Sequence, residues 1–160
     1  MKGLKGGAIC ALTLLVAAVL QQSLAYRLSV FGARPDFMLI ALAVLGMFTN
    51  RPGGIALGFF DGLIVGAVAN ANMQHYVASR TLTGLLLGWT SSVELPRSVP
   101  AAGLVAAAVT LFAQLTLMFL APPHSIAAFL ADTIRGAVYN GVLAIPVYAL
   151  LKKFLAPVVR

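Results

Sequence analysis

The sequence predicts an all-α integral membrane protein, a bundle of six transmembrane helices in a single domain over residues 1–160. Three observations predict this fold class. Hydrophobic residues make up 61% of the 160 residues and charged residues only 9%, whereas a soluble domain carries about 25% charged residues. Long apolar runs recur along the whole chain, separated by short segments that hold most of the charges. None of these runs shows the alternating pattern of a membrane β-barrel.

Six apolar segments, taken in chain order, are the expected spans. A helix needs about 17–25 apolar residues to cross a bilayer, so the shorter runs are expected to extend into their flanks. Before the last span, residues 125–135 carry Ile126, Leu130 and Ile134 at helical spacing, which predicts a short amphipathic lead-in. The expected spans are 7–25, 36–49, 53–70, 79–92, 101–121 and 136–153.

The first span has a second interpretation as a signal peptide. Ser23 and Ala25 form a small-x-small pattern before Tyr26, as at a cleavage site. The apolar segments that follow are equally suited to a membrane, and this favours the interpretation that the first segment is retained as a span.

The basic residues predict that both termini lie in the cytoplasm, because loops on that side of a membrane carry an excess of Lys and Arg. With six spans, the outer side receives Arg27, Arg34 and Arg80. The side of the termini receives Lys2, Lys5, Arg51, Arg97, Lys152, Lys153 and Arg160. The same residues form no basic stripe with interleaved aromatic residues, so the net charge of +7 does not indicate nucleic-acid binding.

The third span carries a strip of glycines. Gly54, Gly58, Gly62 and Gly66 recur every four residues, and each step turns only about 40° around a helix. They therefore form one winding strip of bare backbone on which another helix can pack closely. In the fourth span, Gly84 and Gly88 stand one turn apart. These glycines are the expected helix-packing residues.

Asp61 lies in the middle of the third span, within about 20° of Gly54 on the helical wheel. A carboxylate at membrane depth is a candidate functional residue. Two interpretations stay open. Asp61 is either a buried polar clamp, bonded to a hydroxyl, backbone group or arginine of another helix, or a member of a proton or cation relay. The clamp is favoured, because no second carboxylate or histidine is expected at mid-span.

No catalytic or cofactor-binding motif is present. The sequence lacks a nucleophile elbow, a phosphate-binding glycine loop and the H-E-x-x-H motif. Its one cysteine, Cys10, and its two histidines, His75 and His124, have no metal-ligand spacing. We therefore expect a protein without enzymatic activity, metal or cofactor.

Several segments resemble the rod-shape-determining protein MreD family. The last span reads Tyr-Asn-Gly-Val-Leu-Ala-Ile-Pro-Val-Tyr over residues 139–148 and ends at Lys152-Lys153, similar to the family's C-terminal signature. The resemblance covers residues 34–153. It rests on Pro35 and Asp36 in Arg34-Pro35-Asp36-Phe37, on Gly58-Phe59-Phe60-Asp61-Gly62, on Gly84 and Gly88 before Trp89, and on Tyr139, Asn140 and Pro146. The sequence departs from the family pattern in the third span, where the usual acid would stand at position 66, so the resemblance leaves the role of Asp61 open.

The resemblance implies a fold similar to the substrate-binding subunits of energy-coupling-factor transporters. It also implies a non-catalytic inner-membrane component of the bacterial cell-elongation machinery. Its partners would be MreC, the glycosyltransferase RodA with its penicillin-binding transpeptidase, MreB indirectly, and membrane lipid.

Two other functions remain open. The first is a substrate-binding subunit of a vitamin-uptake transporter, which would require an outer cavity with convergent polar side chains, expected around Asn70–His75. The second is a proton-coupled carrier that uses Asp61.

Overall fold

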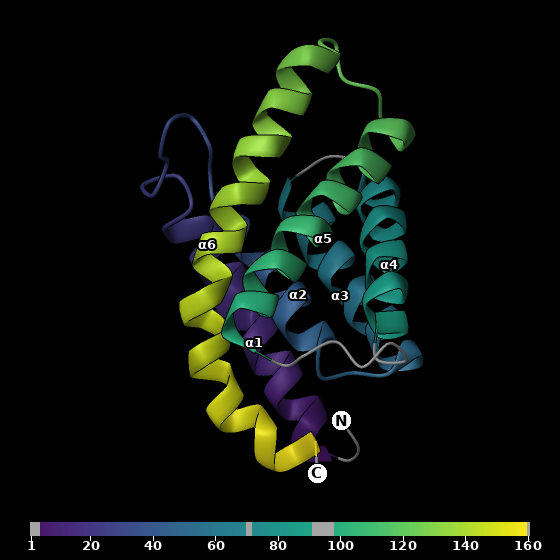
Figure 1. Ribbon diagram of the computed structural model, residues 1–160. Coiled ribbons are helices and arrows are strands. Elements are labelled where there is room, and N and C mark those ends of the chain that lie inside the picture. The colour runs from purple at the N-terminus through teal and green to yellow at the C-terminus, as the bar shows by residue number, and fades with distance from the viewer. Residues whose placement is uncertain (1–3, 70–71, 91–97, 160) are drawn as a thin grey trace.

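The computed structural model describes residues 4–69, 72–90 and 98–159. These residues form six helices, and the part of the chain that is described contains no sheet (Figure 1). The helices are α1 (Leu4–Ser23), α2 (Phe37–Gly46), α3 (Arg51–Ala69), α4 (Met73–Thr90), α5 (Val99–Leu120) and α6 (Ile126–Val159). The all-α class predicted from the sequence is therefore confirmed.

Four of the six helices are long and apolar enough to cross a membrane, namely α1, α3, α5 and most of α6. Large apolar side chains on them face outward, and Leu12, Leu104 and Val138 are each more than 60% exposed. Exposed apolar area on this scale is unfavourable in water but matches a hydrocarbon environment. The chain is thus a multi-pass membrane protein.

Helix α2 is the centre of the bundle and contacts each of the other five helices. Every residue from Met38 to Phe48 is buried, as expected of a helix that is hydrophobic all round. Asp36 begins the helix, and its Oδ1 accepts a hydrogen bond from the Leu39 amide at 2.9 Å. With ten residues α2 is only about 15 Å long, and it is shorter than the expected span 36–49.

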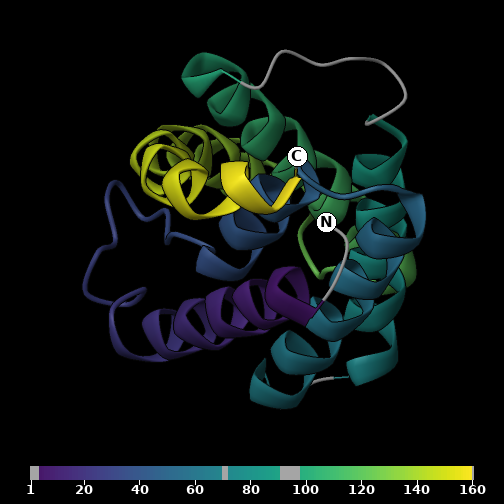
Figure 2. The same cartoon turned by 90° about the horizontal axis from the view of Figure 1, so that it is seen from below.

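Helices α3 and α4 form an antiparallel pair, and α6 lies on the far side of the bundle (Figure 2). Helix α4 begins at Met73, six residues before the expected start at Ser79. The polar residues Gln74, His75 and Arg80 lower its hydropathy, so α4 is not among the four helices that qualify by apolarity. The expected ends of these spans, at residues 70 and 92, lie outside the described residues.

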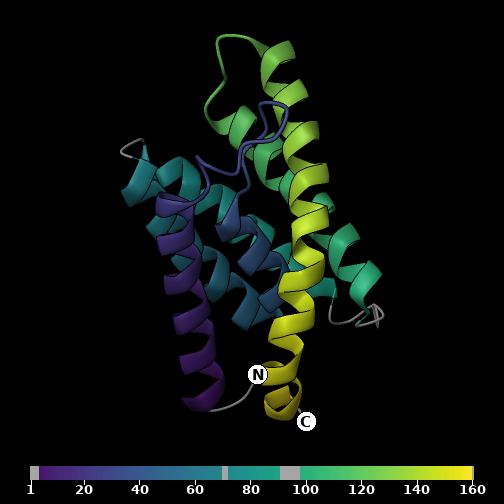
Figure 3. The same ribbon diagram turned by 90° about the vertical axis from the view of Figure 1, so that its left-hand side faces the viewer.

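Helix α6 runs without interruption from Ile126 to Val159 and continues through Pro146. Its 34 residues measure about 51 Å, more than the roughly 30 Å of a hydrocarbon core. The expected lead-in and the expected last span are therefore one helix. The start of α1 and the end of α6 lie at the same end of the bundle, opposite the α1–α2 and α5–α6 connections (Figure 3). The charged residues Lys2, Arg97 and Arg160 lie outside the described part of the chain.

Candidate functional site

A buried arginine stands between two aspartates in the core of the bundle. Nη2 of Arg80 donates a hydrogen bond to Oδ2 of Asp36 at 2.7 Å, and Nε lies 3.7 Å from Oδ2 of Asp61. Arg80 and Asp61 are 3% and 0% exposed, and the Asp36 side chain is 20% exposed. Three charged side chains from α3, α4 and the start of α2 thus meet away from the surface.

The placement of Arg80 corrects the sequence interpretation, which counted this residue among the charges of the outer side. The charge is inside because α4 begins earlier than expected, which moves Arg80 into the third turn of the helix. A buried guanidinium is tolerated only when it is paired and hydrogen-bonded, and Asp36 and Asp61 supply the opposite charge. The sequence feature that could have identified the burial of Arg80 is that it stands in a helical segment with no other Lys, Arg, Asp or Glu.

The glycine strip of α3 explains how Arg80 reaches Asp61. A Cβ atom added at Gly58 would clash with the backbone carbonyl oxygen of Arg80, and one added at Gly54 would clash with that of Gly84. Further along, a Cβ at Gly62 would lie 2.6 Å from Cα of Val77. The two backbones are therefore in contact along the strip. Gly58 precedes Asp61 by one turn, so this approach brings the Arg80 side chain to the carboxylate.

The remaining glycines continue the same contact at both ends. A Cβ at Gly66 would lie 2.9 Å from Cα of Met73, and a Cβ at Gly88 would lie 2.6 Å from Cα of Arg51. The strip predicted from the sequence thus faces α4 of the same chain, which the sequence did not identify. Since α4 covers it, the strip is not a surface for another protein.

Asp61 is held by charge rather than by hydrogen bonds. Neither of its carboxylate oxygens has a hydrogen-bond partner among the described residues, and neither does Nη1 of Arg80. Asp36, in contrast, bonds both Arg80 and the Leu39 amide. Asp36 is therefore the hydrogen-bonded partner of Arg80, and Asp61 is a second partner at a longer distance. Arg80 is an arginine of another helix, which is one of the partners that the polar-clamp interpretation of Asp61 names.

Asn140 extends the polar network to α5 and α6. Its Oδ1 accepts a hydrogen bond from the Asp36 backbone amide at 2.9 Å, and its Nδ2 donates to Oγ1 of Thr110 at 3.1 Å. Thr110 in turn donates to the Ala106 carbonyl. On the neighbouring side, Ser79 donates to the Ala113 carbonyl at 2.7 Å and joins α4 to α5. No sequence pattern marked Thr110 or Ser79, because isolated hydroxyls are common in apolar helices.

Residues of α6 hold the α1–α2 connection in place. Oη of Tyr139 donates to the Leu28 carbonyl at 2.7 Å, and Nη1 of Arg135 donates to the Phe31 carbonyl at 3.0 Å. Phe31 and Gly32 both have positive φ, and Val30 and Ala33 pair across them. Of the other two residues in the resemblance, Pro35 is buried just before Asp36, and Pro146 is exposed on α6.

A polar cavity of about 440 Å³ lies between this connection, α5 and α6. Among its lining residues, Gln114 and Thr133 make no side-chain hydrogen bond in the described part of the chain, while Asp36, Thr110 and Asn140 belong to the network above. Of the expected ligand position around Asn70–His75, the described residues 72–75 are not among the residues that line this cavity. Asn70 itself lies outside the described residues, and His75 lines neither this cavity nor the two others of comparable size.

The described residues contain no group of three or more His, Cys, Asp or Glu side chains that could hold a metal ion. The site is thus a buried network of charges, hydroxyls and an amide that joins five helical segments. Comparison of the chain with protein-family models, with curated proteins and with solved structures found no match.

Proposed function

We propose that this chain is a non-catalytic component of the bacterial cell-elongation machinery in the inner membrane. It crosses the membrane six times with both termini in the cytoplasm. In this role it binds MreC and helps to couple MreB filaments to the peptidoglycan synthase made of RodA and its penicillin-binding transpeptidase. The proposal starts from the resemblance to the MreD family.

One observation carries the proposal: the segments that bear the resemblance contact one another in space. Asp36, from the Arg-Pro-Asp segment, is hydrogen-bonded to Asn140 of the Tyr-Asn segment, 104 residues later. Gly54 and Gly58 of the third helix pack on Gly84 and Arg80 of the fourth. Arg80 then joins both pairs through Asp36 and Asp61. The segments that carry the resemblance thus meet in one connected core of polar groups and close-packed glycines.

The use of the buried charges supports a binding role. Arg80, Asp36 and Asp61 are engaged with each other, and Asn140 is engaged with the backbone and with Thr110. A general acid or base has to reach the proton that it transfers, and the Asp61 carboxylate is fully enclosed. A rigid polar core of this kind fixes the positions of helices whose outer faces then bind partners.

The expected topology agrees with the arrangement of the chain ends. An even number of crossings places both termini on one side, and the start of α1 and the end of α6 lie at the same end of the bundle (Figure 3). Helix α2 alone covers about half of the hydrocarbon core. It completes a crossing with its flanking residues, of which Pro35, Met47, Phe48 and Thr49 are buried in protein where their backbone groups can be satisfied.

Affinity purification from the native bacterium, followed by mass spectrometry, tests the proposal. We expect MreC among the recovered proteins, with RodA and its transpeptidase in lower amounts.

A photoreactive amino acid at Phe59, Leu104 or Val138, whose side chains are exposed, should crosslink to a partner from at least one position. The same reagent at the buried Leu42 is the control. Recovery of folded protein with none of these partners contradicts the proposal.

A second function is favoured by the polar cavity between the α1–α2 connection, α5 and α6. A substrate-binding subunit of a vitamin-uptake transporter requires an outer cavity with convergent polar groups, and this cavity is lined by Gln114 and Thr133, whose side chains make no hydrogen bond among the described residues. Mass spectrometry of small molecules released from the purified protein tests this role. A ligand that is lost in Gln114→Ala with Thr133→Val, but kept in the control Thr116→Val, would support it. Absence of any retained ligand from the wild type contradicts it.

A further inference from the structure

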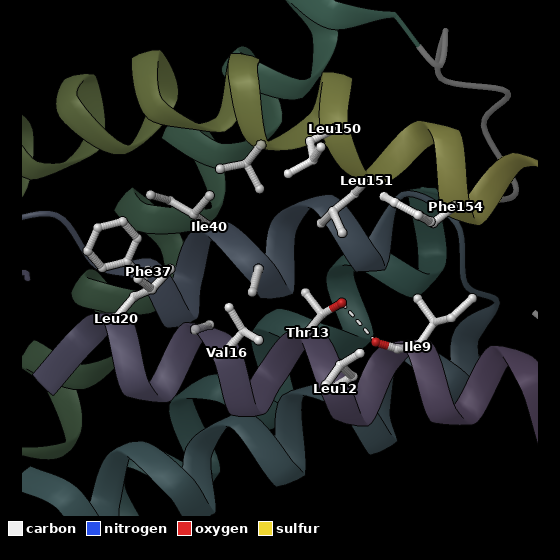
Figure 4. Close-up of a pocket in the computed structure, with 13 residues that line it drawn as sticks. Ile9, Leu12, Thr13, Val16, Leu20, Phe37, Ile40, Leu150, Leu151 and Phe154 are labelled. Atoms are coloured by element: carbon white, nitrogen blue, oxygen red, sulfur yellow. Dashed lines mark hydrogen bonds between the residues drawn. The ribbon is translucent and has the colours of Figure 1, made fainter. Parts of the chain in front are cut away.

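An apolar groove of about 350 Å³ lies on the outside of the bundle between α1 and α6, with α2 as its floor (Figure 4). It exists because α1 packs mainly on α2 and makes few contacts with α6. Among the described residues of its lining, Thr13 is the only polar one, and its hydroxyl donates to the Ile9 carbonyl of the same helix at 2.8 Å. The groove therefore offers an occupant only apolar contacts.

The groove has the length of one membrane leaflet. Its lining on α1 extends from Ile9 to Leu20, which corresponds to about 16 Å of helix. Half of a hydrocarbon core of about 30 Å is about 15 Å. In Figure 4, Ile9 and Phe154 mark one end of the groove, and Leu20 and Phe37 mark the other. An acyl chain that enters at the Ile9 end runs along α1 past the midpoint of the helix and reaches Leu20, three residues before the helix ends at Ser23.

Positive charge gathers at the end marked by Ile9 and Phe154. Lys5 stands one turn before Ile9 on α1, and Lys152 and Lys153 stand between the lining residues Leu151 and Phe154 on α6. All three lysines are exposed. Nζ of Lys152 lies 5.8 Å from the centre of the ring of Tyr148, which is not in the groove lining, so Lys152 points away from the groove and leaves Lys5 and Lys153 as its basic side chains. No acidic residue occurs in 1–35 or in 133–160, so nothing on these segments neutralises the lysines.

We propose that this groove, which we call the α1–α6 groove, binds one acyl chain of an anionic phospholipid while Lys5 and Lys153 bind its headgroup phosphate. Basic residues beside a transmembrane groove recognise anionic headgroups, and long lysine side chains extend readily to the headgroup region. The site is independent of the partners named above.

The lysines favour an anionic lipid over a protein helix as the occupant of the groove. A partner helix would have to carry acidic residues opposite the lysines at the membrane surface, whereas an anionic lipid supplies that charge in any bilayer that contains it.

Native mass spectrometry of the full chain tests the proposal. The protein is released from nanodiscs that contain phosphatidylglycerol and phosphatidylcholine in equal amounts, and the retained lipids are counted. We expect at least a tenfold preference for phosphatidylglycerol in the wild type. The double variant Lys5→Gln, Lys153→Gln should lower this preference by a factor of about ten. The control double variant Arg27→Gln, Arg51→Gln removes the same charge from other exposed positions and should keep the preference.

A second pair of variants tests the groove itself. Val16 lines it and is 50% exposed, whereas Val19 on the same helix is 66% exposed and lies outside it. Val16→Trp should displace the bound lipid, and Val19→Trp should retain it. Equal retention by these two variants, or equal binding of the two lipids by the wild type, overturns the proposal. So does a lipid-free wild-type dimer that Val16→Trp dissociates, since a second copy would then be the occupant.

Discussion

Nε of Arg80 lies 3.7 Å from Oδ2 of Asp61, and both side chains are buried in the centre of the bundle. The contact is possible because Gly58, one turn before Asp61, lets the backbone of α4 touch α3. Asp61 is therefore one side of a charge network that also contains Asp36. This relationship leads to the first two predictions, and the wider network and the membrane placement lead to the others.

Removal of the buried cation should destabilise the protein far more than removal of the looser anion. Arg80→Met leaves Asp36 and Asp61 without an opposite charge, and we expect a loss of about 3–5 kcal/mol in unfolding free energy. Asp61→Asn keeps the bond between Arg80 and Asp36 and should cost about 1 kcal/mol or less. Thermal unfolding in detergent, followed by the fluorescence of Trp89, measures both. Equal losses in the two variants would contradict this order.

Asp61 should carry no protons across the membrane. Its carboxylate is fully enclosed, and Asp61 is not among the residues that line the polar cavity or the α1–α6 groove. In liposomes under a pH gradient, we expect the wild type and Asp61→Asn to show the same proton flux as liposomes without protein. A flux in the wild type that disappears in Asp61→Asn would restore the interpretation of Asp61 as a proton carrier.

A methyl group on the glycine strip should force α3 and α4 apart. At Gly58 the added Cβ would meet the Arg80 backbone, so Gly58→Ala should cost about 1–3 kcal/mol. At Gly136 on α6 a Cβ meets nothing within 4 Å, and Gly136→Ala should stabilise by about 0.5–1 kcal/mol through the lower entropy of its unfolded chain. Opposite shifts of the unfolding temperature are the expected result. A stable Gly58→Ala variant would show that the two helices are not in backbone contact.

Loss of the Asn140 side chain should weaken the connection between α2, α5 and α6. In Asn140→Leu the Asp36 amide loses its acceptor in a buried position, which costs about 1–3 kcal/mol. Thr116→Val is the control, because that hydroxyl bonds only to the Phe112 carbonyl of its own helix. We expect the control to change the unfolding free energy by less than about 0.5 kcal/mol. A similar change in both variants would mean that Asn140 does not join the helices.

Single cysteines should report the orientation of the chain. In a Cys10→Ala background, a membrane-impermeant maleimide added to intact spheroplasts should label Arg27→Cys at once. Lys5→Cys and Lys153→Cys should react only after the membrane is made permeable, because the excess of basic residues places that end in the cytoplasm. The reverse pattern would invert the proposed topology, and labelling of all three in intact cells would contradict six crossings.

Much of the fold follows from local patterns. The positions of the apolar segments, the start of α2 at Asp36 and the strip from Gly54 to Gly66 depend on composition and helical spacing, which a sequence displays directly. The ion pair between Asp132 and Arg135, at 3.2 Å, follows from their separation of three residues on one helix. Each of these features arises within one segment, so no knowledge of the neighbours was needed to predict it.

The location of Arg80 and the partner of the glycine strip were decided by tertiary structure. An arginine near a predicted membrane edge is usually a topology signal. The Arg80 guanidinium can be buried because the carboxylates of Asp36 and Asp61 beside it offset the free-energy cost of its desolvation. The hydrogen bond between Asp36 and Asn140 joins residues 104 positions apart, and no local pattern encodes such a contact. The sequence by itself determined that this chain belongs in a membrane as a helical bundle, because hydrophobicity is a property of each segment. Which helix meets which, and therefore where the charges and the α1–α6 groove lie, depended on how all six helices fill the space around α2.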